Sequence, residues 1–244
     1  MTRRRWIADE VSGNRAALVG AHARHLTQAL RAKVGQQFEI STGADVRLGR
    51  ICSLQPDRVD FELAEAVTMA EALPITVAIS VFKFDRMEWA IEKCVELGVA
   101  RIIPLIAARS EPHLGAGAAK RVERWRRLAR QAAEQSRRSA APEIAAPVKL
   151  QHLLAETRGT CVVLSEVEAS RTLMEALPKD AAGISFAFGP EGGWKQEELA
   201  AFEAAKWQPA SLGSTILRAE TAVIAAVAVC RSVLQGVLPK NEPD

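Results

Sequence analysis

Two glycine-bearing segments near the C-terminus carry the residue types that could bind a small molecule and do chemistry on it. The first is Phe188–Gly193, with the sequence FGPEGG, and the second is Leu212–Thr221, with the sequence LGSTILRAET. Glycines let the backbone approach a ligand closely, and Glu191, Arg218 and Glu220 add charge beside that backbone. The two segments therefore predict one shared pocket, although each could also be an ordinary turn between a strand and a helix.

An alternation of strands and helices after residue 74 would place both segments at one edge of a sheet. Apolar runs predict strands at 75–81, 101–107, 144–148, 161–165, 184–188 and 210–212, and helices are predicted between them. The first helix is expected to begin at Asp85, where Glu88 forms a pattern like a capping box, and to end before Gly98. Strands joined by such helices are parallel, and ligands bind where their carboxyl ends meet. Both glycine segments follow a strand, so they are expected to line that crevice.

The first 70 residues have a different pattern. Short runs rich in β-forming residues alternate with turns at Gly13-Asn14, Gly43 and Pro56-Asp57, and one helix from about Ala21 to Arg31 interrupts them. The strands are predicted around residues 6–7, 17–19, 38–40, 50–52 and 59–61. This pattern predicts a small β-barrel domain over residues 1–70, followed by an α/β domain over residues 74–244.

An arginine-rich helix is predicted between Ala118 and Ser139. It has one apolar stripe and a wide basic flank, in which only Glu123 and Glu134 are acidic, whereas the basic residues are Lys120, Arg121, Arg124, Arg126, Arg127, Arg130, Arg137 and Arg138. The flank could follow a phosphate backbone, or it could be a solvated helix face with pairs inside the helix. The preceding Gly115-Ala116-Gly117 lacks the third glycine of a dinucleotide fingerprint and is expected to be a flexible connection.

Composition agrees with an intracellular enzyme without metal. The chain has 244 residues, 48% of them hydrophobic, and a net charge of +3. Its four cysteines lie far apart, without metal-ligand or disulfide spacing, and are expected to be reduced and mostly buried. The longest apolar run, 222–230, is much shorter than the roughly 20 residues that span a bilayer. We therefore expect a cytoplasmic protein that binds neither a metal nor a membrane.

Nearly the whole chain resembles the 16S rRNA (uracil-N3)-methyltransferases of the SPOUT class, which use S-adenosylmethionine. Besides the two glycine segments, the resemblance rests on Lys83, Met87-Glu88, Lys93, Glu96-Leu97-Gly98-Val99, Pro104, Arg109-Ser110 and Glu134-Gln135-Ser136. It implies an α/β fold in which a SPOUT-type knotted parallel-sheet domain follows a small PUA-like, RNA-binding β-barrel. It also implies a homodimer whose interface adjoins the cofactor, acting on 16S rRNA or on the assembled small ribosomal subunit.

The implied reaction assigns roles to individual residues. Because N3 of uracil carries a proton at neutral pH, its methylation needs a base, a cation that stabilises the uracil anion, or both. Arg218 suits the cation, and Glu191 could orient the uracil or relay its proton. Alternatively, Arg218 could pair with Glu220 or Glu191, and Glu191 could cap a helix. The implied RNA contacts are Arg4, Arg31, Lys83, Arg109 and Arg138. S-adenosylmethionine would contact Leu164, Glu166, Phe188, Gly189, Gly192, Gly193, Leu212, Gly213, Ser214, Ile216, Leu217, Ala219 and Thr221.

The chain departs from the family pattern at several positions. Thr215 stands where an arginine usually precedes the Ile-Leu-Arg run, Ser214 replaces a common proline, and Arg137 stands where glycine is frequent. These changes bear on the target site more than on the reaction type. Two other functions remain open from sequence: a SPOUT methyltransferase acting on another RNA, and a non-catalytic RNA-binding or ribosome-assembly protein that kept the scaffold.

Overall fold

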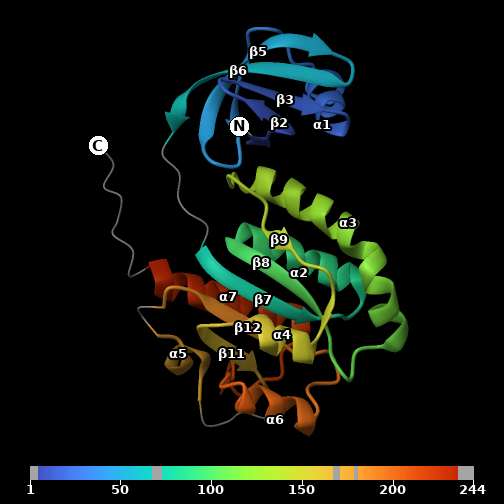
Figure 1. Ribbon diagram of the computed structural model, residues 1–244, viewed down its shortest axis with the longest axis vertical. Coiled ribbons are helices and arrows are strands. Elements are labelled where there is room, and N and C mark those ends of the chain that lie inside the picture. Colours follow the sequence, from blue (N-terminus) through green and yellow to red (C-terminus); the bar gives the residue numbers. More distant parts are fainter. Residues whose placement is uncertain (1–4, 68–72, 167–170, 179–180, 236–244) are drawn as a thin grey trace. The chain divides into compact units, whose positions relative to one another are not determined.

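The computed structural model describes residues 5–67, 73–166, 171–178 and 181–235. They fall into two compact units, each with its own sheet (Figure 1). The N-terminal unit takes the described residues within Met1–Glu71 and also Arg130–Ala141, a later stretch that lies inside the predicted second domain. The C-terminal unit takes those within Ala72–Ala129 and Pro142–Asp244.

The N-terminal unit is built on a curled six-stranded sheet in the order β1-β4-β5-β6-β3-β2. Its strands are β1 (Trp6–Ile7), β2 (Glu10–Ser12), β3 (Arg15–Val19), β4 (Gln37–Ser41), β5 (Val46–Gln55) and β6 (Arg58–Val67). The predicted helix is present as α1 (Ala21–Arg24) followed by one π-helical turn (His25–Ala29). Trp6, Leu26 and Phe61 are buried in its core. Because β1 and β2 lie at opposite edges of the described sheet, the sheet is a curled half-barrel where the sequence predicted a small β-barrel.

A cluster of charged side chains is enclosed in this unit. Asp9 accepts a hydrogen bond from the backbone N–H of Val19 at 2.9 Å, lies 3.1 Å from Nδ1 of His22, and pairs with Arg130 at 2.9 Å. Glu134, which the sequence showed only as one of two acidic residues in the arginine-rich segment, is fully buried and lies 3.6 Å from Nε of Arg130. Residues of β1 and α1 cover this carboxylate, with the backbone N–H of Ile7 and the ring of His22 close by.

Asp9→Asn is expected to lower the free energy of unfolding by about 1 kcal/mol at pH 7, because it replaces a carboxylate that accepts hydrogen bonds. Burial alone would raise the pKa of Asp9, but the bonds from His22 and Val19 and the charge of Arg130 outweigh it and hold the pKa below its ordinary value. A lowered carboxyl pKa stabilises the fold above the unfolded pKa of about 3.9, and this contribution disappears as the pH falls through the folded pKa. Urea titrations at pH 7 and pH 3 test this: a difference between wild type and variant that is unchanged at pH 3 contradicts it.

The C-terminal unit is an α/β unit whose strand pairs are all parallel. Its described strands are β7 (Leu73–Ser80), β8 (Val99–Ile106), β9 (Glu143–Ile144), β10 (Val148–Lys149), β11 (Thr160–Leu164), β12 (Ile184–Phe188) and β13 (Gln208–Ala210). The sheet order is β10-β8-β7-β12-β11-β13, with β9 paired to β8. The parallel α/β sheet is confirmed, except that the strand predicted at 144–148 is two short strands.

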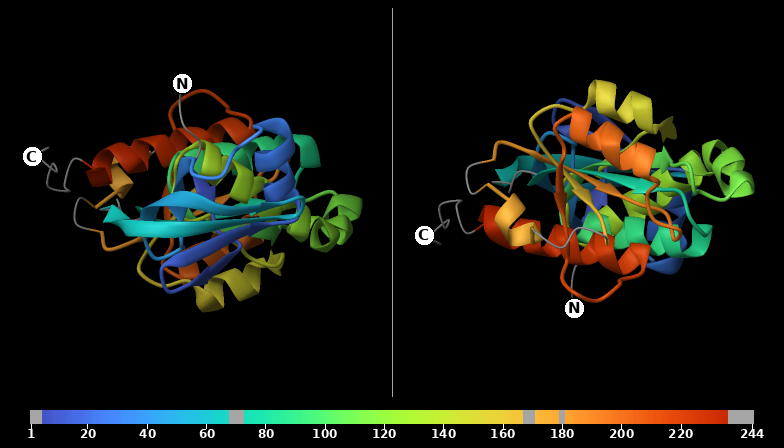
Figure 2. Two further views of the ribbon diagram at one scale, coloured as in Figure 1. Left: turned by 90° about the horizontal axis from the view of Figure 1, so that it is seen from above. Right: turned by 90° about the horizontal axis from the view of Figure 1, so that it is seen from below.

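Helices cover both faces of this sheet. The helices of this unit are α2 (Phe84–Glu96), α4 (Leu150–Glu156), α5 (Leu173–Ala176), α6 (Gln196–Ala204), α7 (Ala219–Gln235) and, as far as Ala129, α3 (Pro112–Gln135). In the right view of Figure 2, α2 and α7 lie on one face of the sheet and α4 and α6 lie on the other. Within the described residues, none of these helices combines the length and apolar character needed to cross a bilayer.

The start of α2 differs from the prediction, whereas its end agrees. Lys83 is the N-cap residue and donates no side-chain capping bond, so the capping box expected at Asp85 and Glu88 is absent. Glu88 instead accepts two hydrogen bonds from Arg124 of α3, at 2.6 and 2.7 Å. Gly98 ends the helix with a φ of 95°, in the left-handed region that glycine adopts without strain.

Gly115 and Gly117 lie within α3, so the flexible connection that the sequence predicted there is wrong. Pro112 suits the first helical turn, because its missing N–H has no helical acceptor to lose. Gly115→Ala is expected to raise the free energy of unfolding by about 0.5–1 kcal/mol, as is typical of alanine for glycine inside a helix. The added Cβ would lie 3.5 Å from Cγ2 of Ile106, an ordinary contact.

Chemical denaturation of the two glycine variants measures this gain. Gly117→Ala is the matched control, because its Cβ would lie only 3.3 Å from Cζ of Phe84, and we expect a smaller gain there. A Gly115→Ala variant less stable than wild type would contradict a well-formed helix at this point.

Candidate active site at the carboxyl edge of the parallel sheet

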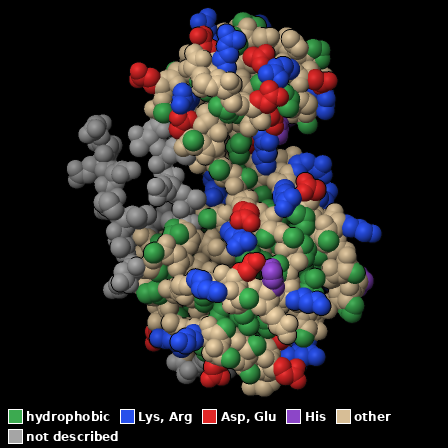
Figure 3. Space-filling view, in the orientation of Figure 1, with side chains coloured by type: hydrophobic (Ala, Val, Ile, Leu, Met, Phe, Trp, Pro, Cys, Tyr) green, Lys and Arg blue, Asp and Glu red, His purple; other side chains and the backbone are tan. Residues whose placement is uncertain are grey.

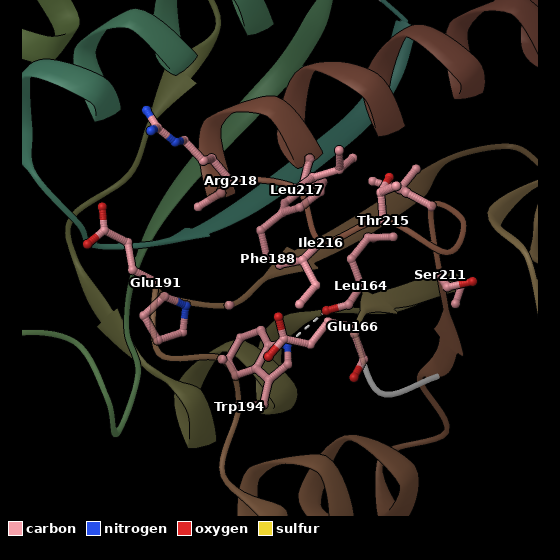
Figure 4. A pocket seen from close by; sticks show the side chains of 18 of the residues that line it. Leu164, Glu166, Phe188, Glu191, Trp194, Ser211, Thr215, Ile216, Leu217 and Arg218 are labelled. Carbon is pink, nitrogen blue, oxygen red and sulfur yellow. Dashed lines mark hydrogen bonds between the residues drawn. The ribbon is translucent and has the colours of Figure 1, made fainter. Parts of the chain in front are cut away.

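The two glycine segments line one cavity of about 490 Å³ (Figure 4). The cavity lies where β7, β12, β11 and β13 end, and these strands are neighbours in the sheet. The loops that follow them therefore converge, although they are far apart in the sequence. This is the crevice expected at the carboxyl ends of parallel strands.

The structure brings most of the predicted site residues together. Those that line the cavity are Lys83, Arg109, Leu164, Glu166, Phe188, Gly189, Glu191, Gly193, Leu212, Gly213, Ser214, Ile216, Leu217, Arg218 and Ala219. Two predicted cofactor contacts do not line it. Gly192 presents its carbonyl to Arg109, and Thr221 is exposed on the first turn of α7. Of the predicted RNA contacts, Arg31 and Arg138 belong to the N-terminal unit, and Arg4 lies outside the described residues.

A tight turn after β12 forms one wall of the cavity. Gly193 donates its N–H to the carbonyl of Pro190 at 2.8 Å and has a φ of 68°. Arg109, which the sequence assigned to RNA, donates from Nη1 to the carbonyl of Gly192 at 2.7 Å. An arginine that binds the backbone of this turn fixes its shape. Arg109 therefore supports the loop, whether or not it also reaches RNA.

Trp194 is a site residue that the sequence analysis missed. Its buried indole Nε1 donates to the carbonyl of Leu164 at 2.9 Å, which joins the turn after β12 to the end of β11 (Figure 4). The ring packs edge-on against Phe202, with ring centroids 4.9 Å apart. A Cβ on Gly189 would lie 3.2 Å from Nε1, so the glycine makes room for the ring. A tryptophan directly after a glycine turn was the signal available in the sequence.

The loop after β13 forms the other wall and offers apolar surface. Ile216 is 82% exposed, yet it lines the cavity together with Leu217 and the buried Leu164 and Phe188. An exposed apolar side chain beside a pocket is typical of a ligand site. Gly213 has a φ of 116°, which a residue with a side chain rarely adopts. The loop therefore offers a ligand both accessible backbone, at Gly213, and apolar side chains.

The sequence left open whether Arg218 pairs with Glu220 or with Glu191, and the structure shows neither pair among the described residues. Arg86 of α2, which the sequence analysis did not single out, lies 3.0 Å from Glu191 and 3.8 Å from Glu220. Within the described part of the chain, Arg218 has no ion pair or hydrogen bond from its side chain. Helix α6 begins at Gln196 with Lys195 as its N-cap, so Glu191 is not a helix cap. In Figure 4, Arg218 and Glu191 lie at one end of the cavity, away from Ser211 and Thr215.

Some arginines of α3 are less available for phosphate contacts than the sequence suggested, because acidic residues of other elements pair with them. Arg124 pairs with Glu88 and Arg130 with Asp9. Figure 3 shows acidic and basic side chains interspersed on the visible face of the N-terminal unit. Arg137 has a φ of 59°, in the left-handed region that glycine adopts without strain.

No group of three or more His, Cys, Asp or Glu side chains among the described residues is arranged to hold a metal ion. Cys94, Cys161 and Cys230 are buried, as expected, and Cys52 is exposed. Burial raises the pKa of the Cys94 thiol to about 12. Burial also raises the pKa of the Cys161 and Cys230 thiols, so these three buried thiols are protonated side chains of the core and not nucleophiles.

Comparison with known proteins gives a consistent family. Residues 69–231 match the family model described as an RNA methyltransferase domain. Two curated relatives, both named ribosomal RNA small subunit methyltransferase E, are each 32% identical to this chain. The one from Synechocystis sp. aligns over 89% of this chain and 73% of its own length. The one from Bacillus subtilis aligns over 86% of this chain and 87% of its own length.

Solved structures extend the likeness to the whole fold. The crystal structure of ribosomal RNA small subunit methyltransferase E from Neisseria gonorrhoeae, bound to S-adenosylmethionine, has a TM-score of 0.83 and 30% identity and covers 95% of this chain and 98% of its own. A methyltransferase from Legionella pneumophila, also with bound S-adenosylmethionine, has a TM-score of 0.82 and 28% identity. It covers 94% of this chain and 96% of its own. The predicted cofactor is thus the molecule bound in both structures. The chain belongs to the RNA methyltransferase family, as a relative of the ribosomal RNA small subunit methyltransferases E.

Proposed function

We propose that this protein is a methyltransferase that uses S-adenosylmethionine and methylates N3 of a uridine in 16S rRNA. The observation that carries the proposal is one cavity between two glycine loops, with an apolar wall and, at one end, Arg218, which has no side-chain partner among the described residues. Arg218 would have a structural partner if its role were to hold the fold together. Its freedom, within the described residues, suits a group that awaits a substrate.

The residues present fit S-adenosylmethionine. The apolar side chains of Leu164, Ile216 and Leu217 suit the adenine, the exposed backbone at Gly189, Gly193 and Gly213 allows close approach, and Glu166 can accept hydrogen bonds from ribose. When bound, this group supplies a sulfonium methyl that can be displaced directly, without a covalent enzyme intermediate. The protein's own contribution is alignment of the two reactants and exclusion of water.

Arg218 and Glu191 act on the uracil in this proposal. The guanidinium of Arg218 stabilises negative charge on the uracil carbonyl oxygens as the N3 proton leaves. Glu191, oriented by Arg86, positions the base or accepts its proton. N3 lies on the pairing edge of uracil, so the nucleotide has to be unpaired or turned out of its stack to react. Lys83 and Arg109, which both line the cavity, and Arg31 and Arg138 of the N-terminal unit are the proposed RNA contacts, with Arg4 beyond the described residues.

The finer architecture belongs to the same proposal. We take the segment from β13 to α7 to be the trefoil knot, the half-barrel to be a PUA-like RNA-binding unit, and the protein to be a homodimer in the cytoplasm, where 16S rRNA and assembling small subunits are found. Support for the dimer comes from α7, whose small side chains, such as Ala225 and Ala228, permit close helix approach. The predicted absence of a metal remains part of the proposal as well.

Calorimetric titration with S-adenosylmethionine, followed by mapping of methylated uridines, tests this function. Well-folded protein that does not bind the cofactor would favour the non-catalytic RNA-binding alternative. Small subunits from cells lacking the protein are expected to lose one N3-methyluridine and to regain it when purified protein and cofactor are added. A modified nucleotide in another RNA would favour the alternative target.

A further inference from the structure

One arginine connects two of the loops that line the cavity. Arg86 lies in the first turn of α2, just after β7, and its Nη1 donates to Oε1 of Glu191 at 3.0 Å. Its Nε lies 3.8 Å from Oε1 of Glu220. Glu191 belongs to the turn after β12, and Glu220 to the first turn of α7. A single guanidinium therefore spans three elements that are distant in the sequence.

The buried carboxylate of Glu220 explains why a cation is needed at this position. The residue is only 6% exposed, and its Oε2 is buried without a hydrogen-bond partner among the described residues. A buried carboxylate is costly unless a cation compensates it, and removal of that cation is strongly destabilising locally. The pair with Glu191 is more exposed, at 33% and 40% for the two side chains, and by itself contributes little to stability. What the pair does is fix where Glu191 points.

The same arrangement leaves Arg218 available. Arg218 directly precedes α7, and among the described residues its side chain makes no ion pair with Glu220, which lies two residues further on. With Arg86 in place, both acids near Arg218 already have a cationic partner. Without Arg86, Glu191 and Glu220 would both lose this cation and would compete for Arg218.

We propose that Arg86 is a positioning residue of the methyl-transfer site. It holds the turn after β12 beside the first turn of α7, fixes Glu191, and keeps Arg218 free for the substrate. This inference rests on the proposed function for its kinetic part. Its structural part concerns the two loops alone and can be tested without any reaction.

Arg86→Ala tests the kinetic part. It is expected to reduce the single-turnover rate of methyl transfer about ten- to a hundredfold, because small misplacements at a reacting centre have effects of that size. Cofactor affinity is expected to fall less, and the KM for RNA to stay within about twofold. Arg86→Lys, which keeps the charge, is expected to recover most of the rate, and adding Glu220→Gln to Arg86→Ala is expected to recover part of it. An Arg86→Ala variant with wild-type rates overturns the proposal.

Arg101→Ala is the matched control. Arg101 of β8 pairs with Glu143 at 3.1 Å, with exposures of 38% and 60%, similar to the pair of Arg86 with Glu191. It lies near the beginning of its strand and does not line the cavity. Its loss is expected to change neither the rate nor the cofactor affinity.

Hydrogen–deuterium exchange separates failure of this proposal from failure of the proposed function. Backbone exchange of residues 189–194 and 211–218 is expected to become faster in Arg86→Ala and to stay unchanged in Arg101→Ala. This outcome supports the positioning role even if the wild-type protein methylates no uridine. Equal exchange in wild type and Arg86→Ala overturns it, whatever the activity.

Discussion

Arg218→Ala is expected to lower the rate of methyl transfer to the uridine by about two to three orders of magnitude, as removal of one preorganised electrostatic contact typically does. The loss should fall on the chemical step, because negative charge on the uracil oxygens develops only as N3 loses its proton. Affinity for S-adenosylmethionine is expected to stay within about threefold, since the cofactor is assigned to the glycine backbone and the apolar side chains. Single-turnover kinetics with saturating cofactor measures the first quantity, and calorimetry measures the second.

A lysine at the same position refines the assignment. Arg218→Lys keeps the charge but loses the planar fork that can contact one oxygen with two N–H groups, so it is expected to recover only part of the rate. Arg158→Ala serves as the control, because Arg158 is exposed on the loop before β11 and does not line the cavity. Near-normal methyl transfer by Arg218→Ala with intact cofactor binding would remove Arg218 from the proposed chemistry.

The sheet and the two glycine loops were predictable because their signals are local. A buried parallel strand is a continuous apolar run, and Ile184–Phe188 gives β12 with the predicted bounds. Glycines after such runs mark loops at the carboxyl edge, so convergence of the two segments followed from the fold class alone. The contact between Arg86 and the turn after β12 was not predictable in this way. Arg86 meets Glu191 only because β7 lies beside β12, and the order of strands in a sheet is not contained in any one segment.

Errors occurred where a local pattern had two physical outcomes. Gly115 and Gly117 resemble a loop by composition, but a proline at the helix start and a buried stripe that includes Leu114 and Trp125 make the segment helical. Glu134 fits a basic helix face by spacing, and only the elements packed against it decide that it is buried. A helix pattern tells which residues share a face, but not what covers that face.

Gly193→Val is expected to weaken binding of S-adenosylmethionine by about a hundredfold, or about 2.7 kcal/mol. Gly193 has a φ of 68°, where a β-branched residue is strained, and a Cβ there would lie 2.8 Å from Oε1 of Glu166. The substitution therefore moves both the turn after β12 and the carboxylate assigned to the ribose. Calorimetric titration measures the affinity, and circular dichroism checks that the fold is kept.

Gly159→Val separates backbone strain from loss of the site. Gly159 precedes β11 with a φ of 85°, and nothing lies within 4 Å of an added Cβ, so the substitution introduces comparable strain away from the cavity. Both variants are expected to lose similar thermal stability, but only Gly193→Val is expected to lose cofactor affinity. Equal affinity in wild type and Gly193→Val would mean that the turn after β12 does not form a wall of the cofactor site. Equal losses in both variants would mean that strain anywhere in the unit is enough to disturb binding, and the direct role of Gly193 would then fail.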